Sequence, residues 1–266
     1  MPTPTEQRPH ADADARPRPS WSARRLDPDR SLGLRLTVAA VAAFLVLVPF
    51  SLLALLVLGS WTPLHRLDEQ VTVTLHAYAV GHPGWVDLMT AWSAVFAPWP
   101  LRMGALALVI WLARRGARRL ALWVITTMVT GGLLGVGLKL LVGRDRPDLL
   151  DPVTRAAGYS FPSGHALNAA LAAGVLLLVV LPMARSPWAR GTVWAAAATV
   201  AVVTGLSRVA IGVHYSSDVL GGWLLGAAVV AATAAGFTAW RHRQHLPPTD
   251  RPGPPGTTPG PDHDSL

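Results

Sequence analysis

Three short groups of polar residues interrupt an otherwise apolar sequence, and each contains residue types that bind phosphate or react with it. In chain order they contain Lys139 and Arg146; Ser163, Gly164 and His165; and Arg208, His214 and Asp218. Ammonium and guanidinium groups bind oxyanions. Imidazole serves as a nucleophile, base or acid, and a carboxylate can hold it in one tautomer. Together these residue types could form a phosphate site.

The first group begins at Lys139, the only lysine in a chain that also has 22 arginines. A compact, flexible ammonium at a helix end, with Arg146 shortly after it, suits a multiply charged oxyanion. The alternative is an ordinary cluster of basic side chains that reach from a membrane boundary into water. Taken alone, this group leaves both interpretations open.

The second group directly precedes an apolar run. Ser163 is a good helix N-cap, and Gly164 lets backbone N–H groups approach a ligand closely at a helix N-terminus, which favours anions. His165 would then project from the first helical turn beside a bound phosphate. The alternative is a plain helix start followed by a histidine at the membrane interface.

The third group ends at Asp218, the only acidic residue between Asp151 and Asp250. It lies just before a strongly apolar run, where an ionised carboxylate is costly unless it is paired. His214 is four residues earlier and is within reach if that turn is helical. A carboxylate-oriented imidazole is what nucleophilic or basic catalysis needs, although a purely structural His–Asp bond would have the same spacing.

The elements that must position these groups are membrane-spanning helices. The chain has 266 residues, of which 51% are hydrophobic and 14% charged, and several apolar runs exceed the roughly 18 residues that indicate a transmembrane helix. We therefore predict an all-α polytopic membrane protein with a bundle of six spans and interfacial helices on its outer face. The predicted spans are 37–59, 98–113, 120–141, 166–183, 192–211 and 219–240.

Residues 61–97 are more polar and contain Trp61, Trp85 and Trp92, which are typical of the lipid interface. They predict one or two helices near the outer surface. Residues 1–30 and 244–266 are rich in proline and predict disordered cytoplasmic tails on either side of one domain, 31–243. No cleavable signal peptide is expected in the first 30 residues.

Basic residues predict the orientation of the spans. Twelve arginines flank the span ends on the side of both termini, against seven lysine or arginine residues on the other side. The positive-inside rule then places both termini in the cytoplasm and the three polar groups on the extracytoplasmic face of the plasma membrane. The formal net charge of +8 is explained by this topology, so no nucleic-acid partner is expected. The absence of cysteine excludes disulfides and thiolate chemistry.

The three groups together resemble the type-2 phosphatidic acid phosphatase family, which shares its core with vanadium haloperoxidases and glucose-6-phosphatase. The family pattern is Lys-x6-Arg-Pro, then Pro-Ser-Gly-His, then Ser-Arg-x5-His-x3-Asp. Every fixed position is present here, from Lys139 to Asp218. The six-span plan extends the resemblance to Leu32–Arg241.

This resemblance implies a role for each matching residue. His214 would be the nucleophile that forms a phosphohistidine, with Asp218 as its orienting partner. His165 would protonate the leaving oxygen and later activate water. The phosphate would be held by Lys139, Arg146, Arg208, Ser163 and the Gly164 backbone. Because the chain lacks a cluster of carboxylates, we expect a metal-independent enzyme without a cofactor.

The expected function is hydrolysis of a membrane lipid phosphate or diphosphate. The resemblance favours undecaprenyl diphosphate, phosphatidic acid or phosphatidylglycerol phosphate, and the motifs do not select among their tails. One alternative is a phosphotransferase that passes the phosphoryl group to an acceptor other than water. Another is a non-catalytic lipid-binding or transport protein on the same scaffold. The oligomeric state is not indicated by the sequence.

Overall fold

The computed structural model describes residues 28–149 and 156–243, and its regular elements in these ranges are helices. They are α2 (Pro28–Leu58), α3 (Thr62–Gly81), α4 (Pro83–Val95), α5 (Pro98–Arg114), α6 (Arg118–Val142), α7 (Gly164–Val180), η1 (Leu181–Met183), α8 (Pro187–Ala210) and α9 (Ser216–Arg243). Residues 1–27 and 244–266, which make up most of the two expected tails, lie outside the described residues.

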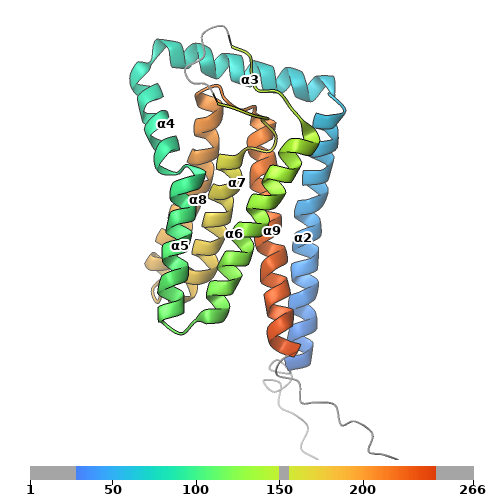
Figure 1. Cartoon of the computed structure of the whole chain (residues 1–266), viewed down its shortest axis with the longest axis vertical. Coiled ribbons are helices and arrows are strands. Elements are labelled where there is room, and N and C mark those ends of the chain that lie inside the picture. The colour runs from blue at the N-terminus through green and yellow to red at the C-terminus, as the bar shows by residue number, and fades with distance from the viewer. Residues whose placement is uncertain (1–27, 150–155, 244–266) are drawn as a thin grey trace, which may run out of the picture.

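Six long helices, α2 and α5 to α9, run roughly along one direction and form a bundle (Figure 1). Helix α9 packs against both α7 and α2, while α7 also contacts α8, α6 and α5. The main apolar core is formed mainly by α2, α5, α6, α7 and α9 and includes Phe50, Val124, Leu167, Leu171 and Val229. The prediction of an all-α bundle is confirmed.

Five helical segments of the described residues are long and apolar enough to cross a membrane: Pro83–Arg114, Arg118–Val142, Gly164–Met183, Pro187–Ala210 and Ser216–Ala239. Residues 44–58 of α2 pass the same test together with α3, which would make a sixth span. The protein is therefore a multi-pass membrane protein, as the sequence predicts. The limits of the expected spans agree with these helices within a few residues, except at the starts of the first two. Helix α2 begins at Pro28 instead of residue 37, and the second apolar stretch begins at Pro83 instead of residue 98.

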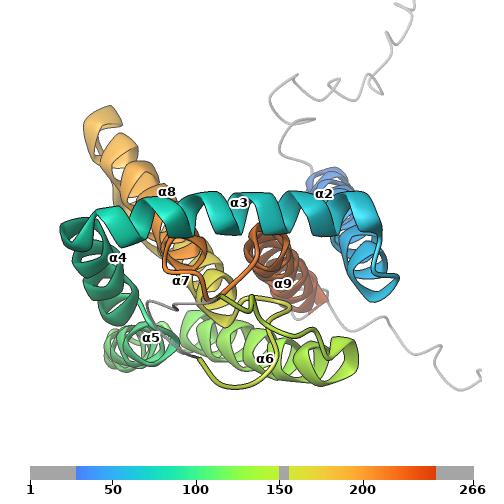
Figure 2. The ribbon, with the colours of Figure 1, turned by 90° about the horizontal axis from the view of Figure 1, so that it is seen from above.

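Helix α3 lies across one end of the bundle, at 90° to the last part of α2 (Figure 2). One face of it is buried and includes Asp68, Thr72 and Ala79. On the same side Val71 and Leu75 pack against the ends of α7, α8 and α9. Arg66 and Glu69 of this helix are exposed, as expected for the interfacial helix that the sequence predicts.

Helix α4 differs from that prediction. It forms one apolar 32-residue stretch with α5, from Pro83 to Arg114, and turns away from α3 (Figure 1). Its sequence carries a single charged residue, Asp87, so it can follow α5 into an apolar environment. The region 61–97 therefore contains one helix across the bundle end and one that continues a span.

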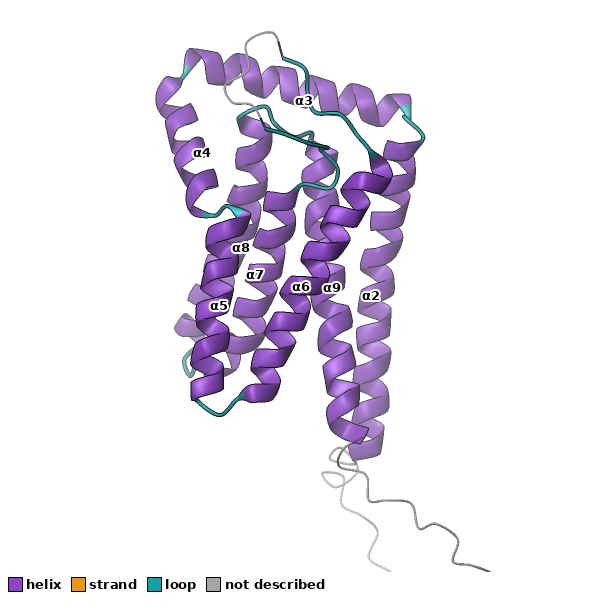
Figure 3. Ribbon diagram, in the orientation of Figure 1, coloured by secondary structure: helices purple, strands orange, loops and turns teal. Residues whose placement is uncertain are grey.

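Two glycines allow the chain to bring the polar groups together. Gly143 ends α6 in the left-handed conformation, with a φ of 61°, which a residue without Cβ adopts readily. At Gly222 in α9 a Cβ would lie only 2.7 Å from the Ser163 carbonyl oxygen, so the two backbones can approach closely. In Figure 3 the loop after α6 and the loop before α9 meet at the end covered by α3.

Candidate active site

The centre of the site is a buried His214–Asp218 pair. The Nδ1–H of His214 donates to Asp218 Oδ2 over 3.2 Å, and the Tyr215 backbone N–H donates to the same oxygen over 3.0 Å. His214 is 2% exposed and Asp218 is fully buried. The sequence predicts this contact only if the turn from His214 to Asp218 is helical. In the structure His214 instead precedes α9, and the bond reaches into the first turn of α9.

Burial lowers the pKa of His214 to about 4. The hydrogen bond and negative charge of Asp218 raise this pKa, whereas the positive charges of Arg146 and Lys139 lower it further. The imidazole is therefore neutral at neutral pH. Because its Nδ1–H is directed to Asp218, Nε2 carries the lone pair. Nη1 of Arg146 lies 3.2 Å from this Nε2.

Arg146 and Lys139 are held by backbone carbonyls of the segment that leads into α7. Arg146 donates from Nε to the Gly158 oxygen over 2.8 Å, and from Nη1 to the Val213 oxygen over 2.8 Å. Lys139 donates from Nζ to the Tyr159 and Ser160 carbonyls. Both cations are thus held beside His214 by neutral carbonyl groups. These hydrogen bonds leave their positive charges uncompensated.

The second group lies directly against the other two. The Ser163 N–H donates to the Asp218 carbonyl over 2.9 Å, and a Cβ at Gly164 would lie 4.0 Å from Lys139 Cε. Ser163 occupies the N-cap position of α7, as predicted, but its hydroxyl forms no capping bond. Its Oγ is buried with no hydrogen-bond partner among the described residues.

His165 and Arg208 complete the set of predicted residues. Arg208 donates from Nη1 to Ser93 Oγ on α4, and its Nε is buried without a partner among the described residues. The His165 ring bonds to the Ser93 backbone and is within electrostatic range of Arg208 and His214. The fold therefore brings all eight predicted residues to one end of the bundle.

Two buried donors in this cluster, Ser163 Oγ and Arg208 Nε, lack partners in the part of the chain that the structure describes. Buried polar groups are normally paired, and leaving one unpaired costs about 1–3 kcal/mol. An oxyanion would accept from both donors and from the nearby cations. The arrangement is thus suited to hold a phosphate next to a neutral imidazole.

Sequence reasoning missed Ser93 and Arg144, which contact this cluster, and Asp68, which is joined to it through Arg144. Ser93 is an ordinary serine in an apolar helix, and no signal marks it. Asp68 is one of only seven acids between Ser31 and Arg241, and that rarity could have drawn attention to it. Arg144 lies between Lys139 and Arg146 in the sequence, and nothing in the sequence distinguishes it from the other basic residues near this membrane boundary.

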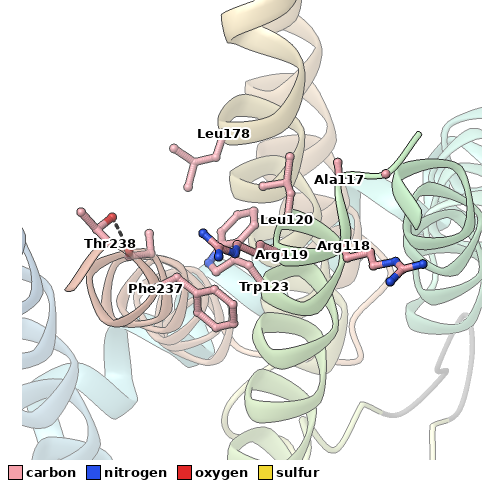
Figure 4. A pocket seen from close by; sticks show the side chains of 10 residues that line it. Ala117, Arg118, Arg119, Leu120, Trp123, Leu178, Phe237 and Thr238 are labelled. Carbon is pink, nitrogen blue, oxygen red and sulfur yellow. Dashed lines mark hydrogen bonds between the residues drawn. The ribbon is translucent and has the colours of Figure 1, made fainter. Parts of the chain in front are cut away.

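Among the hollows formed by the described residues, two lie outside this cluster. One, of about 720 Å³, is at the opposite end of the bundle, where α6 begins and α9 ends (Figure 4). Arg119, Trp123 and Phe237 line it. The other, of about 470 Å³, is an apolar groove between α5 and α6 with Arg102 at its edge. Neither is lined by the predicted residues, and hydrogen bonds connect the second hollow to them.

Comparisons with known proteins agree with this geometry. Residues 120–242 match the model of the PAP2 superfamily. The chain is 41% identical over 100 residues to phosphatidylglycerophosphatase B of Bacillus subtilis, which corresponds to 36% of this chain and 48% of that protein. It is 35% identical over 117 residues to an undecaprenyl-diphosphatase of Sulfolobus acidocaldarius, covering 41% and 51% of the two chains.

A solved structure resembles the whole bundle. The crystal structure of a transmembrane PAP2-type phosphatidylglycerolphosphate phosphatase from Bacillus subtilis superimposes with a TM-score of 0.64 at 25% sequence identity. The alignment covers 76% of this chain and 96% of that one. By sequence, the chain spans about half the length of the curated relatives it matches.

Proposed function

We propose that the chain, whose residues 120–242 match the PAP2 superfamily model, is a member of that superfamily and hydrolyses the phosphate or diphosphate of a membrane lipid through a phosphohistidine. The observation that carries this proposal is the buried His214–Asp218 pair. Its free Nε2 is next to Arg146, and two further donors nearby are without partners. A neutral, oriented imidazole beside a preformed anion site is suited to nucleophilic attack on phosphorus.

In the first step His214 Nε2 attacks phosphorus, and the bond from phosphorus to the lipid oxygen breaks. His165 donates a proton to the departing oxygen. Arg146 must turn from Nε2 to the phosphate oxygens, which frees the lone pair only when substrate is bound. Lys139 and Arg208 stabilise the negative charge that develops on the equatorial oxygens.

In the second step water attacks the phosphohistidine and releases inorganic phosphate. The unprotonated His165 accepts a proton from this water, and the P–N bond to His214 breaks. Asp218 stabilises the imidazole throughout by accepting from Nδ1–H. All the positive charge of the site comes from side chains, so we propose that no divalent metal is required. No three His, Asp or Glu side chains in the described ranges are grouped to hold one.

The apolar groove between α5 and α6 supports a lipid rather than a soluble substrate. Its lining is almost wholly apolar, and Arg102 lies at its edge. Arg102 Nε donates to Asn168 Oδ1 over 3.1 Å, and Asn168 Nδ2 donates to the Gly164 carbonyl over 2.8 Å. The groove is therefore linked to the start of α7, and it could receive a hydrocarbon chain whose phosphate occupies the site.

The proposed substrates are those of the sequence analysis, namely undecaprenyl diphosphate, phosphatidic acid or phosphatidylglycerol phosphate. Two relatives are named for phosphatidylglycerophosphate and undecaprenyl diphosphate, which favours these two. We also propose that residues 31–243 form the catalytic domain in the plasma membrane, with both termini cytoplasmic and the site extracytoplasmic. A phosphotransferase would use the same first step and a different acceptor in the second.

Purified protein in detergent, with a panel of lipid phosphates and excess chelator, tests the proposal. We expect inorganic phosphate from at least one lipid, and inhibition by vanadate. With an activated aryl phosphate, the His165→Ala variant should accumulate labelled phosphoenzyme because its second step lacks a base, whereas His214→Ala should form none.

Three results would contradict parts of this proposal. Loss of turnover in chelator with recovery in magnesium would exclude the metal-independent reaction. Equal labelling of both variants would show that His214 is not the nucleophile. A phosphorylated acceptor without inorganic phosphate would identify a transferase.

A further inference from the structure

A carboxylate outside the three sequence groups is fully buried next to the site. Asp68 of α3 has no exposed surface. Its Oδ1 accepts from Ser216 Oγ over 2.7 Å and from the Ser217 backbone N–H over 2.9 Å. Its Oδ2 accepts from Ser217 Oγ and, over 2.8 Å, from Nη2 of Arg144. Both oxygens of the Asp68 carboxylate therefore have their acceptor positions occupied, although this carboxylate does not contact His214.

Arg144 joins this carboxylate to the catalytic one. Its Nη2 donates to Asp68 and its Nη1 donates to Asp218 Oδ1, both over 2.8 Å. Its guanidinium also lies 4.2 Å from the centre of the Tyr215 ring. Because a guanidinium is planar, these contacts fix the plane and position of Arg144, and Arg144 in turn fixes the Asp218 carboxylate.

We propose that Asp68 and Arg144 are positioning residues that hold Asp218 with Oδ2 toward His214 and preserve its negative charge for the imidazole. This inference rests on the proposed function of His214. Neither residue hydrogen-bonds to His214 in the structure, so both act through Asp218. The interfacial helix α3 thus forms part of the catalytic machinery as well as covering it.

The geometry divides the two oxygens of Asp218 between two tasks. Oδ1 is held by Arg144, and Oδ2 remains for His214 and the Tyr215 N–H. Without Arg144 the carboxylate could rotate about its Cβ–Cγ bond and direct either oxygen to His214. An orienting carboxylate acts by fixing the tautomer and direction of the imidazole, so this rotation would weaken the nucleophile.

The charges explain why both residues are needed. A buried arginine paired with Asp218 alone would cancel the negative charge that stabilises His214 when it carries a phosphoryl group. Asp68 supplies a second negative charge, so Arg144 is neutralised from its other side. The three groups together retain a net charge of about −1 on the side of Asp218.

Other charged groups also face His214, and their contributions remain constant in the test. They are Lys139 of α6, Arg146 of the loop after it, His165 of α7 and Asp218 of α9, and Arg208 of α8 acts on His165. Substitutions at Asp68 and Arg144 remove none of these charges. A change in the pKa of His214 in such variants therefore reports the charge that was removed.

The test uses Arg144→Gln and Asp68→Asn, with exposed neighbours on α3 as matched controls. Arg66→Gln removes an exposed arginine, and Glu69→Gln removes an acid whose side chain is 56% exposed. The pKa of His214 is measured by NMR titration of histidine-labelled protein, with the resonance assigned by its loss in His214→Gln. This readout requires no substrate. kcat and KM are measured separately with a lipid phosphate.

The two variants should move the pKa of His214 in opposite directions. Arg144→Gln removes a positive charge and should raise it by about one unit. Asp68→Asn removes a negative charge and should lower the pKa of His214. We expect kcat to fall about 10- to 100-fold in Arg144→Gln and about 10-fold in Asp68→Asn. KM should remain nearly unchanged, because neither residue contacts the substrate and both act by orienting Asp218.

A merely structural tie between α3 and α9 would give a different result. Loosening would admit water in both variants and raise the pKa of His214 toward its ordinary value in each. That outcome, or a kcat within twofold of the wild type in both, would overturn the inference. Arg144→Lys keeps the charge but not the planar fork, so it should keep the pKa and recover only part of kcat. If no lipid phosphate is hydrolysed by the wild type, the proposed function fails while the titration still tests the charge arrangement.

Discussion

Replacing Gly222 by alanine should impair the site without altering a polar residue. A Cβ at this position would lie 2.7 Å from the Ser163 carbonyl oxygen, whereas ordinary contacts begin at 3.4 Å, so α9 and the start of α7 must separate by about 0.7 Å. The neighbour is backbone and cannot rotate away. Overpacking of this kind costs about 1–3 kcal/mol of stability.

The same shift should reduce catalysis more than stability alone would suggest. Asp218 lies one turn before Gly222, and the Ser163 N–H donates to the Asp218 carbonyl over 2.9 Å. Separation of the two backbones would therefore move the phosphate-binding donors relative to His214. A misplacement of about 1 Å can cost 100-fold in rate, so we expect kcat/KM to fall about 10- to 100-fold.

The assay is phosphate release in detergent, together with thermal unfolding of the same samples. Gly236→Ala on the same helix is the control, since a Cβ there would meet nothing within 4 Å. It should leave both quantities unchanged. A Gly222→Ala variant with a lowered Tm and full activity would refute the argument, because it would show that catalysis tolerates movement between α7 and α9.

Two further predictions concern single groups of the site. Because burial lowers the pKa of His214 to about 4, the imidazole remains neutral above that pH. On the acid side of the profile kcat/KM, corrected for titration of the substrate phosphate, should persist to about pH 5 and fall as the pH is lowered through 4; an acid-side midpoint near 6.5 would contradict this. Ser163→Ala removes a buried hydroxyl without a partner in the described residues, so Tm should be unchanged or higher. kcat/KM should nevertheless fall about 100-fold, as when one transition-state donor is lost, and a parallel loss of both would contradict a role in phosphate binding.

The sequence predicted the spans because their signal is local. An apolar run such as 120–141 contains its own evidence, and α6 was observed from Arg118 to Val142. The direction of α4 could not be predicted in this way. Its tryptophans suggested the interface. Pro83 indicates a helix break at His82, because proline disfavours helical backbone in the residue before it. Whether α4 then continues α3 or α5 is not determined by any local pattern.

The three groups were predicted to meet because topology places them at the same ends of their helices. Their detailed contacts could not be predicted. Ser163 was correctly placed as an N-cap residue, yet its hydroxyl is not used for capping. Helix propensity identifies where a serine is favoured, but the hydrogen-bond partners of that serine depend on residues that are distant in sequence. Here the Ser163 backbone N–H donates to the Asp218 carbonyl.

Asp68 shows most clearly what local patterns leave out. It precedes Glu69 on a helix that also carries His65 and Arg66, so the sequence suggests one more charged residue on a solvated face. Its burial follows from the 90° turn after α2, which directs this side of α3 toward the ends of α8 and α9. Once the carboxylate is there, its cost without a cation makes Arg144 necessary, and Arg144 brings it into contact with Asp218. A buried acid in an interfacial helix therefore indicates a connection to a distant charged site, and the partner becomes identifiable only when the tertiary structure is known.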